Sequence, residues 1–295
     1  MKRLLRKAYR YIRYFLSMAK WKCKVRFVER PKRANPDPSD HKLNDHINLF
    51  YWQMSEQEEN LGDYLSKVVV THFMPQKNSP AAGKSIKTLF ATGSILGFRC
   101  QDATIWGSGM LYHHSIYLDR LRFSKLDIRA VRGPETRKLL LGIGKDCPEV
   151  YGDPAILMPL IFKPENVIKK HKVSIVLHYD HGNYAIPDGF ECNMIDIVTK
   201  DYKSFITQIM ESELVISSSL HGIILAETYG VPAVFLAPKK LRLFKYEDWY
   251  HSTGRYDIVV AKSIAEALMV QPMPLPDLEK MQQKLLQAFP SDLWE

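Results

Sequence analysis

The sequence has little cysteine, and the cysteines that it has are scattered. Cys23, Cys100, Cys147 and Cys192 show neither a CxxC spacing nor the Cys and His intervals of a zinc site. The pattern indicates neither a disulfide scaffold nor a structural metal, and it favours the reducing cytoplasm. We therefore expect no metal site in this chain.

Long hydrophobic runs and nucleotide-binding glycine loops are also missing. The longest uncharged stretch of the N-terminal segment, Tyr14–Ala19, is too short for the core of a signal peptide or for a transmembrane helix. No GxGxxG or Walker motif occurs, which argues against NAD and ATP, and we expect no cofactor. With 295 residues and 46% hydrophobic content, the chain is nevertheless long and apolar enough for two packed α/β domains.

Positive charge is concentrated at one end of the chain. Residues 1–33 hold 13 of the 41 Lys and Arg residues and a single acid, Glu29, so their formal charge is +12. The formal net charge of the whole chain is +9. The remaining residues therefore carry −3. A mildly acidic body does not offer the basic stripe that a nucleic-acid-binding protein needs, so we expect no nucleic-acid partner.

Residues 1–33 are predicted to be a basic amphipathic arm. Apolar residues recur in it at helical spacing, surrounded by Lys, Arg, Tyr and Trp: Leu4, Leu5, Ala8, Ile12, Phe15, Leu16 and Ala19. This composition is typical of a helix that lies on an anionic membrane surface. A solvated basic helix and a helix packed against the body are the alternatives. We expect a cytoplasmic protein that associates peripherally with the inner face of the cytoplasmic membrane.

The rest of the chain alternates strand and helix patterns. The polar segment Arg30–His41 contains three prolines and predicts a linker, placed at residues 34–42. Strands are expected at Ile47–Trp52, Leu89–Thr92, Thr104–Trp106, Asp127–Val131, Val173–His178, Met194–Val198, Leu214–Ile216 and Ala233–Leu236, and helices at Asp63–Met74, Pro134–Leu141 and Asp277–Phe289. The alternation predicts two Rossmann-like domains, residues 43–165 and 166–295, that face each other across a cleft, with the last helix packing back on the first domain.

The segment Leu214–Leu236 is the most informative part of the sequence. It reads as strand, tight turn, helix and strand, and Gly230 with Pro232 ends the helix. Five residues lie between the first strand and the helix: Ser217, Ser218, Ser219, Leu220 and His221. Free N–H groups and the helix dipole favour an anion there, which predicts a phosphate or carboxylate site. The alternative is that the serines only cap the helix and that His221 is a core histidine.

Two further candidates follow strands of the first half, at the sheet edge where open α/β sheets bind ligands. Arg132 follows Asp127–Val131, and its guanidinium suits bidentate binding of a carboxylate or phosphate; a surface ion pair is the alternative. Gly107, Ser108 and Gly109 follow the strand ending at Trp106, and their small side chains leave backbone N–H groups open to an anion. Tight turns, however, need glycine regardless.

Other polar and aromatic residues stand next to expected helices and strands. At the start of the first expected helix, Asp63 is predicted as its N-cap and Gly62 allows close backbone approach next to Asn60. His178 ends the first strand of the second half, where contact with a sugar and an exposed loop are the alternatives. Lys239, Lys245, Trp249 and Tyr250 follow the strand Ala233–Leu236, where aromatic faces beside hydrogen-bonding groups suit carbohydrate stacking, although Trp249 can equally pack between the domains.

Taken in register, these segments resemble the polysaccharide pyruvyltransferase family. SSSLHG, an apolar helix and YGVPAVFL are similar to its C-terminal signature. Five other motifs occur in the expected order within about residues 47–260: NLGDYLSKVV, ATIWGSGM, IRAVRGPETRKLL, YGDPAIL and KYEDWYHSTGR. The resemblance implies a glycosyltransferase-B-like fold and transfer of pyruvate from phosphoenolpyruvate, the co-substrate, to a sugar as a ketal.

The resemblance also implies roles for the candidate residues. His221 and Arg132 are then catalytic. The donor contacts are Ser217, Ser218, Ser219, Leu220, Gly107, Ser108, Gly109, Lys239 and Lys245, and the acceptor contacts are Asn60, Gly62, Asp63, His178, Trp249 and Tyr250. Some family members carry arginine where this chain has Ser219, so Lys239, Lys245 or another arginine would have to compensate.

The acceptor is predicted to be a hexose of a surface polysaccharide or of its polyprenyl-diphosphate-linked precursor, because the basic arm would hold the protein at the membrane. Two alternatives stay open. One is a nucleotide-sugar-dependent glycosyltransferase of the same fold, and the other is a non-catalytic, membrane-associated protein of capsule assembly.

Overall fold

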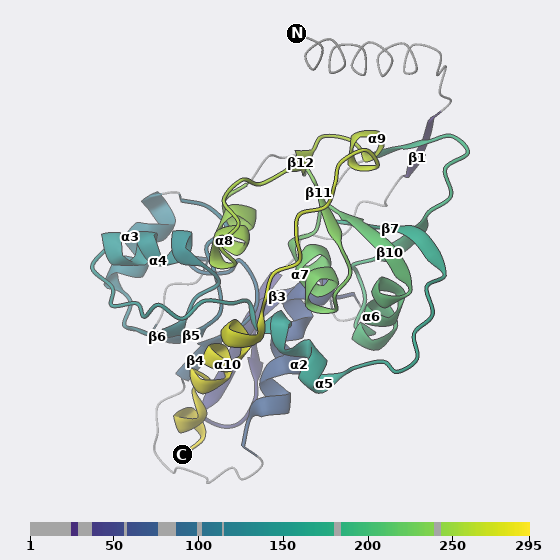
Figure 1. Cartoon of the computed structure of the whole chain (residues 1–295). Coiled ribbons are helices and arrows are strands. Elements are labelled where there is room, and N and C mark those ends of the chain that lie inside the picture. The colour runs from purple at the N-terminus through teal and green to yellow at the C-terminus, as the bar shows by residue number, and fades with distance from the viewer. Residues whose placement is uncertain are drawn as a thin grey trace.

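Two five-stranded sheets and the helices around them make up most of the computed structural model (Figure 1). The structure describes residues 25–28, 37–55, 58–75, 87–98, 102–113, 115–179, 184–238 and 243–295. The expected alternation of strands and helices is confirmed, and most boundaries agree within two residues because buried β-branched runs and helix caps fix them locally.

The first sheet has the order β2-β3-β4-β5-β6 and is parallel except for the β2–β3 pair. Its strands are β2 (Asp37–Lys42), β3 (Ile47–Gln53), β4 (Lys87–Phe90), β5 (Ala103–Trp106) and β6 (Leu126–Ala130). The helices of this half are α2 (Leu61–Phe73), α3 (Ser115–Phe123) and α4 (Pro134–Gly142). Strands β3 to β5 are largely buried, as expected for parallel strands covered on both faces.

The predicted linker at residues 34–42 is in part wrong, because Asp37–Lys42 form strand β2. This strand pairs antiparallel with β3 and lies at the edge of the sheet. An edge strand tolerates Pro38, since one row of its backbone groups needs no partner in the sheet. Proline content alone therefore does not distinguish an edge strand from a connection.

The second sheet is parallel throughout, in the order β12-β11-β10-β7-β9. Its strands are β7 (His171–Leu177), β9 (Asn193–Asp196), β10 (Ser212–Ser217), β11 (Ala233–Leu236) and β12 (Val260–Ala261). The helices of this half are α6 (Tyr202–Met210), α7 (Leu220–Thr228), α8 (Phe244–Ser252) and α9 (Ile264–Ala267). Gly230 takes φ = 73° just beyond α7, which confirms it as the end of that helix.

The two halves share one apolar core and are joined by backbone hydrogen bonds. The Leu61 N–H donates to the Ile197 carbonyl at 2.8 Å, so the start of α2 is fixed to the segment after β9. The connection between the halves contains two short helices, η1 (Pro154–Leu157) and α5 (Met158–Ile161).

The last helix, α10 (Glu279–Gln287), and the final turn η2 (Ser291–Trp294) lie against the first half of the chain (Figure 1). The indole of Trp106 at the end of β5 donates to the Leu285 carbonyl at 2.8 Å. In addition, the Gln282 side chain donates to the Ile156 carbonyl at 2.7 Å. The chain therefore crosses back from the second sheet to the first at its C-terminal end.

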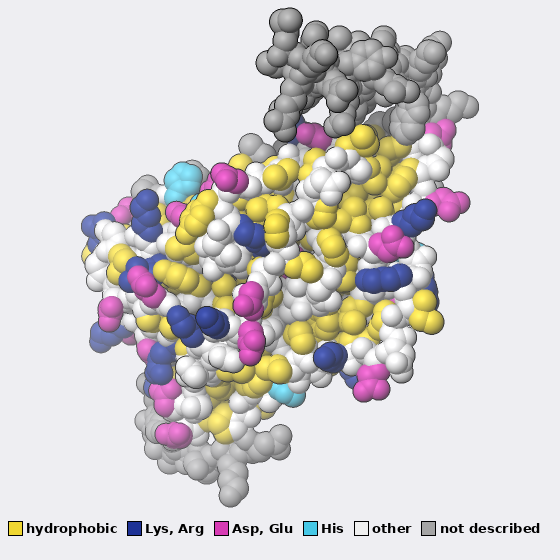
Figure 2. All heavy atoms as spheres, viewed as in Figure 1, with side chains coloured by type: hydrophobic (Ala, Val, Ile, Leu, Met, Phe, Trp, Pro, Cys, Tyr) yellow, Lys and Arg dark blue, Asp and Glu magenta, His cyan; other side chains and the backbone are white. Residues whose placement is uncertain are grey.

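Part of the predicted basic arm forms a strand. β1 (Val25–Val28) pairs antiparallel with β8 (Tyr184–Pro187). The amphipathic helix predicted within residues 1–24 lies outside the described residues. In the part of the chain that the structure describes, no helix is both long and apolar enough to cross a bilayer. On the face shown in Figure 2, Lys and Arg side chains lie among Asp and Glu side chains and form no continuous stripe.

Candidate active site

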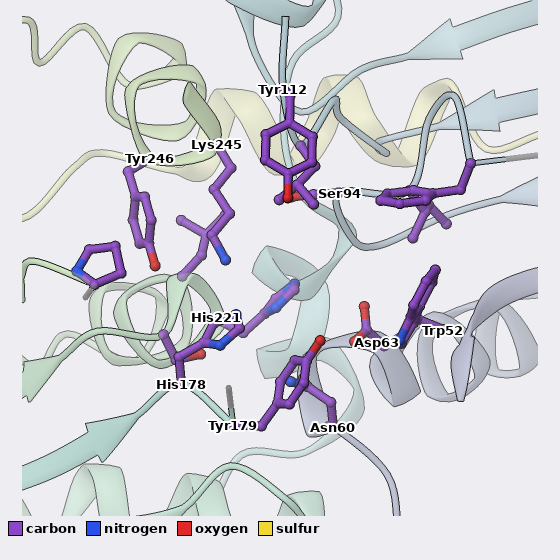
Figure 3. A pocket seen from close by; sticks show the side chains of 16 residues that line it. Trp52, Asn60, Asp63, Ser94, Tyr112, His178, Tyr179, His221, Lys245 and Tyr246 are labelled. Atoms are coloured by element: carbon purple, nitrogen blue, oxygen red, sulfur yellow. The ribbon is translucent and has the colours of Figure 1, made fainter. Parts of the chain in front are cut away.

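A cavity of about 240 Å³ is lined by residues from both halves of the chain (Figure 3). The first half contributes Trp52, Asn60, Asp63, Ser94, Ile95, Phe98, Leu111 and Tyr112, and the second half contributes His178, Tyr179, Ser219, Leu220, His221, Pro238, Lys245 and Tyr246. Seven residues predicted from the sequence therefore meet in one space: Asn60, Asp63, His178, Ser219, Leu220, His221 and Lys245.

His221 lies in the first turn of α7 and forms a pair with a buried aspartate. Its Nε2 atom is 3.4 Å from Oδ2 of Asp153, and both atoms are buried without a hydrogen-bond partner in the described part of the chain. The other oxygen of Asp153 accepts from the Ala155 N–H at 3.1 Å and caps η1, which fixes the carboxylate. Such a carboxylate favours a proton on Nε2, so Nδ1 is the ring nitrogen left to exchange protons with a ligand.

Gly62 makes the approach of His221 possible. A Cβ atom at Gly62 would lie 1.9 Å from Nδ1 of His221, so any side chain there would occupy the position of the ring. Gly62 also donates its N–H to the side chain of Asn60 at 2.9 Å, which makes Asn60 the N-cap of α2. The prediction that Asp63 caps this helix is therefore wrong, because Asn60 already fills that role.

Asp63 is half-buried and lines the cavity with a carboxylate that the cap does not use. Burial raises the pKa of Asp63 from its ordinary value of 3.8 to about 6. The nearby charges of His221 and Lys245 lower this pKa, while that of Asp153 raises it. The carboxyl group therefore titrates close to neutral pH.

Three helix N-termini reach the cavity, those of α2, α7 and α8. Lys245, in the first turn of α8, is buried and is the single Lys or Arg among the described lining residues. The Tyr246 hydroxyl donates to the Ser218 carbonyl at 2.6 Å and so ties α8 to the loop before α7. Helix N-termini and an ammonium group together favour a bound anion. Lys239 lies outside the described residues.

In the serine loop before α7, one serine lines the cavity and two are buried structural residues. Ser219 caps α7 by accepting from the Gly222 N–H at 3.4 Å, and it lines the cavity together with Leu220. Ser217 and Ser218 are fully buried and do not line it. The Ser217 hydroxyl accepts from the Ser219 N–H at 3.0 Å, so it shapes the turn. The prediction that Ser217 and Ser218 contact the donor is therefore corrected.

Arg132 is fully buried behind the cavity. Its guanidinium donates to Oδ2 of Asp248 at 3.0 Å and to the Met110 carbonyl at 2.7 Å. A third bond, to the Ser94 hydroxyl at 2.5 Å, reaches a residue that lines the cavity. The prediction of direct donor contact by Arg132 is corrected, because this side chain has no exposed surface. We assign it the role of holding Ser94 and α8 in place.

Gly107, Ser108 and Gly109 do not form an anion-binding loop. The N–H groups of Gly107 and Gly109 donate to backbone carbonyls at 2.9 and 3.0 Å, and the Ser108 hydroxyl donates to another at 2.6 Å. A Cβ at Gly109 would lie 2.4 Å from Cζ of Arg132. The glycine therefore makes room for the buried guanidinium, which corrects the predicted donor contact of this segment.

Trp249 and Tyr250 are also core residues, with 0% and 1% of their surface exposed. The Trp249 indole donates to the Glu227 carboxylate at 3.0 Å, so the face of α8 that carries Trp249 lies toward α7. The predicted acceptor contact of both aromatic residues is corrected. Trp249 is a core residue whose indole bonds within the second half of the chain, and its packing between the domains stays a prediction.

Asp153, which pairs with His221 but does not line the cavity, and several of the lining residues were not predicted from the sequence. Asp153 lies in the recognised segment YGDPAIL, and an Asp-Pro pair after a strand bridge was the signal for it. The aromatic residues Trp52 and Tyr112 follow no local pattern that separates them from core aromatics. Within the described ranges, no three His, Cys, Asp or Glu side chains cluster as they would around a metal ion.

Comparisons with known proteins agree with the motifs. Residues 84–240 match the family model of polysaccharide pyruvyl transferase. Over 216 residues, the chain is 32% identical to the succinoglycan biosynthesis protein ExoV of Rhizobium meliloti (strain 1021), covering 70% of this chain and 64% of that protein. Over 168 residues, it is 27% identical to the uncharacterized protein L143 of Acanthamoeba polyphaga mimivirus, covering 52% and 57%. The matches thus span less than two thirds of the length of either relative.

Proposed function

Because this chain belongs to the polysaccharide pyruvyl transferase family, we propose that it is a pyruvyltransferase of exopolysaccharide biosynthesis. It would transfer pyruvate from phosphoenolpyruvate to a hexose and form a pyruvate ketal. The relative named for succinoglycan biosynthesis supports a polysaccharide acceptor. We also propose that the two sheets belong to two Rossmann-like domains of a glycosyltransferase-B-like fold, because each has parallel strands with helices between them.

The pairing of His221 with Asp153 in a cavity favourable to anions is the observation that carries this proposal. Phosphoenolpyruvate carries a phosphate and a carboxylate. We place it beside Lys245 and the first turn of α7, because an ammonium group and a helix N-terminus meet at this cavity. Lys245 then compensates for the arginine that some family members carry at the position of Ser219.

The reaction needs a proton on the methylene carbon of the donor. Two hydroxyls of the sugar then attack the central carbon in turn, and phosphate leaves. His221 is suited to donate that proton, because its Nε2 is held by Asp153 and the ring is adjacent to the anion site. Asp153 positions the ring.

The acceptor sugar is placed at the other side of the cavity. Trp52, Tyr112 and Tyr179 surround this space together with the polar side chains of Asn60 and Asp63 (Figure 3). Aromatic faces next to hydrogen-bonding groups are suited to a pyranose ring. The charge of +12 on residues 1–33 supports an acceptor linked to polyprenyl diphosphate at the inner face of the cytoplasmic membrane.

The test is to incubate the purified chain with phosphoenolpyruvate and lipid-linked or free oligosaccharides. Mass spectrometry should find a pyruvate ketal on the product, and phosphate should be released in equal amount. Release of a nucleoside diphosphate from a nucleotide sugar, without use of phosphoenolpyruvate, would instead identify a glycosyltransferase. Absence of both reactions would support a non-catalytic role.

A further inference from the structure

Asp63 projects from the first turn of α2 into the cavity (Figure 3). Its backbone N–H donates to the Asn60 carbonyl, but within the described part of the chain no hydrogen bond reaches its carboxylate. A half-buried carboxylate is stabilised when water or a ligand donates hydrogen bonds to it. Its place in the cavity makes Asp63 an acceptor for a ligand group that can donate.

The neighbouring loop leaves this carboxylate accessible. Gly93, which follows β4, takes φ = 107° in the left-handed region that favours glycine. A Cβ atom at Gly93 would lie 3.1 Å from Oδ1 of Asp63. The bare backbone at Gly93 therefore gives the carboxylate room, whereas a larger residue would crowd it.

Ketal formation requires more than one acid/base group. The methylene carbon of the donor gains one proton, and each of two sugar hydroxyls loses one. His221, from α7, is positioned beside the anion site, whereas Asp63, from α2, lies near the aromatic side chain of Trp52. The two groups are close enough that the charge of His221 lowers the pKa of Asp63, so both can act on one reacting centre.

We propose that Asp63 is the catalytic base that removes the proton from the first attacking hydroxyl of the acceptor. This role rests on the pyruvyl transfer proposed above and adds a second acid/base residue to it.

The protons balance over the whole reaction. His221 in its charged form gives a proton to the methylene carbon, and the first hydroxyl oxygen bonds to the central carbon while Asp63 takes the hydroxyl proton. The bond between the central carbon and the phosphate oxygen then breaks, and the phosphate leaves with the proton from Asp63. The second hydroxyl oxygen bonds to the central carbon, and its proton restores charged His221.

The charges that face Asp63 come from four other places. His221 and Lys245 lower its pKa and Asp153 raises it. The charge of Asp63 in turn raises the pKa of Glu59, which lies just before α2. With the pKa of Asp63 near 6, the base form predominates above that pH. We therefore expect kcat/KM to fall as the pH drops below about 6. Glu59, whose pKa is raised to about 7 by burial, needs its own control.

The test compares wild type with Asp63→Asn and with the control Glu59→Gln in ketal formation from phosphoenolpyruvate. Asp63→Asn should lower kcat by about 10²- to 10⁴-fold. The residual kcat/KM of this variant should no longer fall as the pH drops below 6. Calorimetric titration with phosphoenolpyruvate alone should show donor binding at least as tight as in wild type. In Glu59→Gln, kcat/KM should still fall as the pH drops below 6.

Two results would overturn this role, and they differ from each other. If wild type forms ketal and Asp63→Asn keeps both its kcat and its decline below pH 6, then Asp63 is not the base while the pyruvyl transfer stands. If wild type itself forms no ketal, the proposed function fails, and the role of Asp63 fails with it.

Discussion

Replacing Asp63 by asparagine should make the folded protein more stable at neutral and alkaline pH. The pKa of Asp63 is raised by burial from 3.8 to about 6, so the folded state disfavours the charged carboxylate. The stability that comes with the protonated form is fully present below pH 4 and is lost as the pH rises through 6. At about 1.4 kcal/mol for each pH unit, the loss amounts to about 3 kcal/mol above pH 7.

Asparagine carries no charge at any pH, so Asp63→Asn should avoid this loss. The difference in free energy of unfolding between the variant and wild type should grow by up to about 3 kcal/mol between pH 4 and pH 8. Urea unfolding at a series of pH values measures it. Asp119→Asn, at an exposed site on α3, serves as the control for an aspartate-to-asparagine change outside the cavity.

A constant difference for Asp63→Asn over the whole pH range would show that the folded protein does not penalise this charge. The burial and the neighbouring charges described above would then not act on Asp63 as argued. A variant that gains stability and loses turnover would instead match the common conflict between stability and activity at functional sites.

Four other changes have defined outcomes. His221→Ala should fold and lose about 10²- to 10⁴-fold in turnover with phosphoenolpyruvate; wild-type turnover would refute its catalytic role. Gly62→Ala should displace the His221 ring and reduce turnover, whereas Gly142→Ala, where a Cβ meets nothing within 4 Å, should not; equal rates would refute the close contact. Arg132→Met leaves its buried carboxylate partner without a counter-charge and should cost about 3–5 kcal/mol in urea unfolding, and a loss below 1 kcal/mol would contradict this ion-pair role. Deleting residues 1–24, which hold nine Lys or Arg and no acid, should keep activity on a soluble acceptor but abolish co-sedimentation with anionic vesicles at low salt; equal sedimentation would show that the arm is no anchor.

The recognisable motifs serve the scaffold as much as the cavity. In KYEDWYHSTGR, only Lys245 and Tyr246 line the cavity. Arg255 forms a bidentate ion pair with Glu227 of α7 at 2.6 and 2.8 Å, and its guanidinium lies 4.6 Å from the centre of the Tyr250 ring. These contacts hold α8 against α7. Residues recognised in such a motif therefore need not touch a substrate.

The sequence by itself determined the elements and the position of the key histidine. Buried β-branched runs predicted most strands, and the serine loop with Gly230 bounded α7, because strand pattern, helix capping and turn conformation depend on residues a few positions apart. His221 and Ser219 were placed at a helix N-terminus for the same reason. Alternation of strands and helices also predicted two successive sets of parallel strands.

Tertiary structure alone decided which side chains meet. Asp153 joins His221 across 68 positions of the chain, and Arg132 joins Asp248 across 116. Whether a polar residue after a strand faces a cavity or a buried partner depends on how helices from distant segments pack, and no local pattern carries that information. Arg132 and Trp249 therefore looked like site residues but lie in the core, whereas Asp153 became part of the site through the packing of η1 against α7.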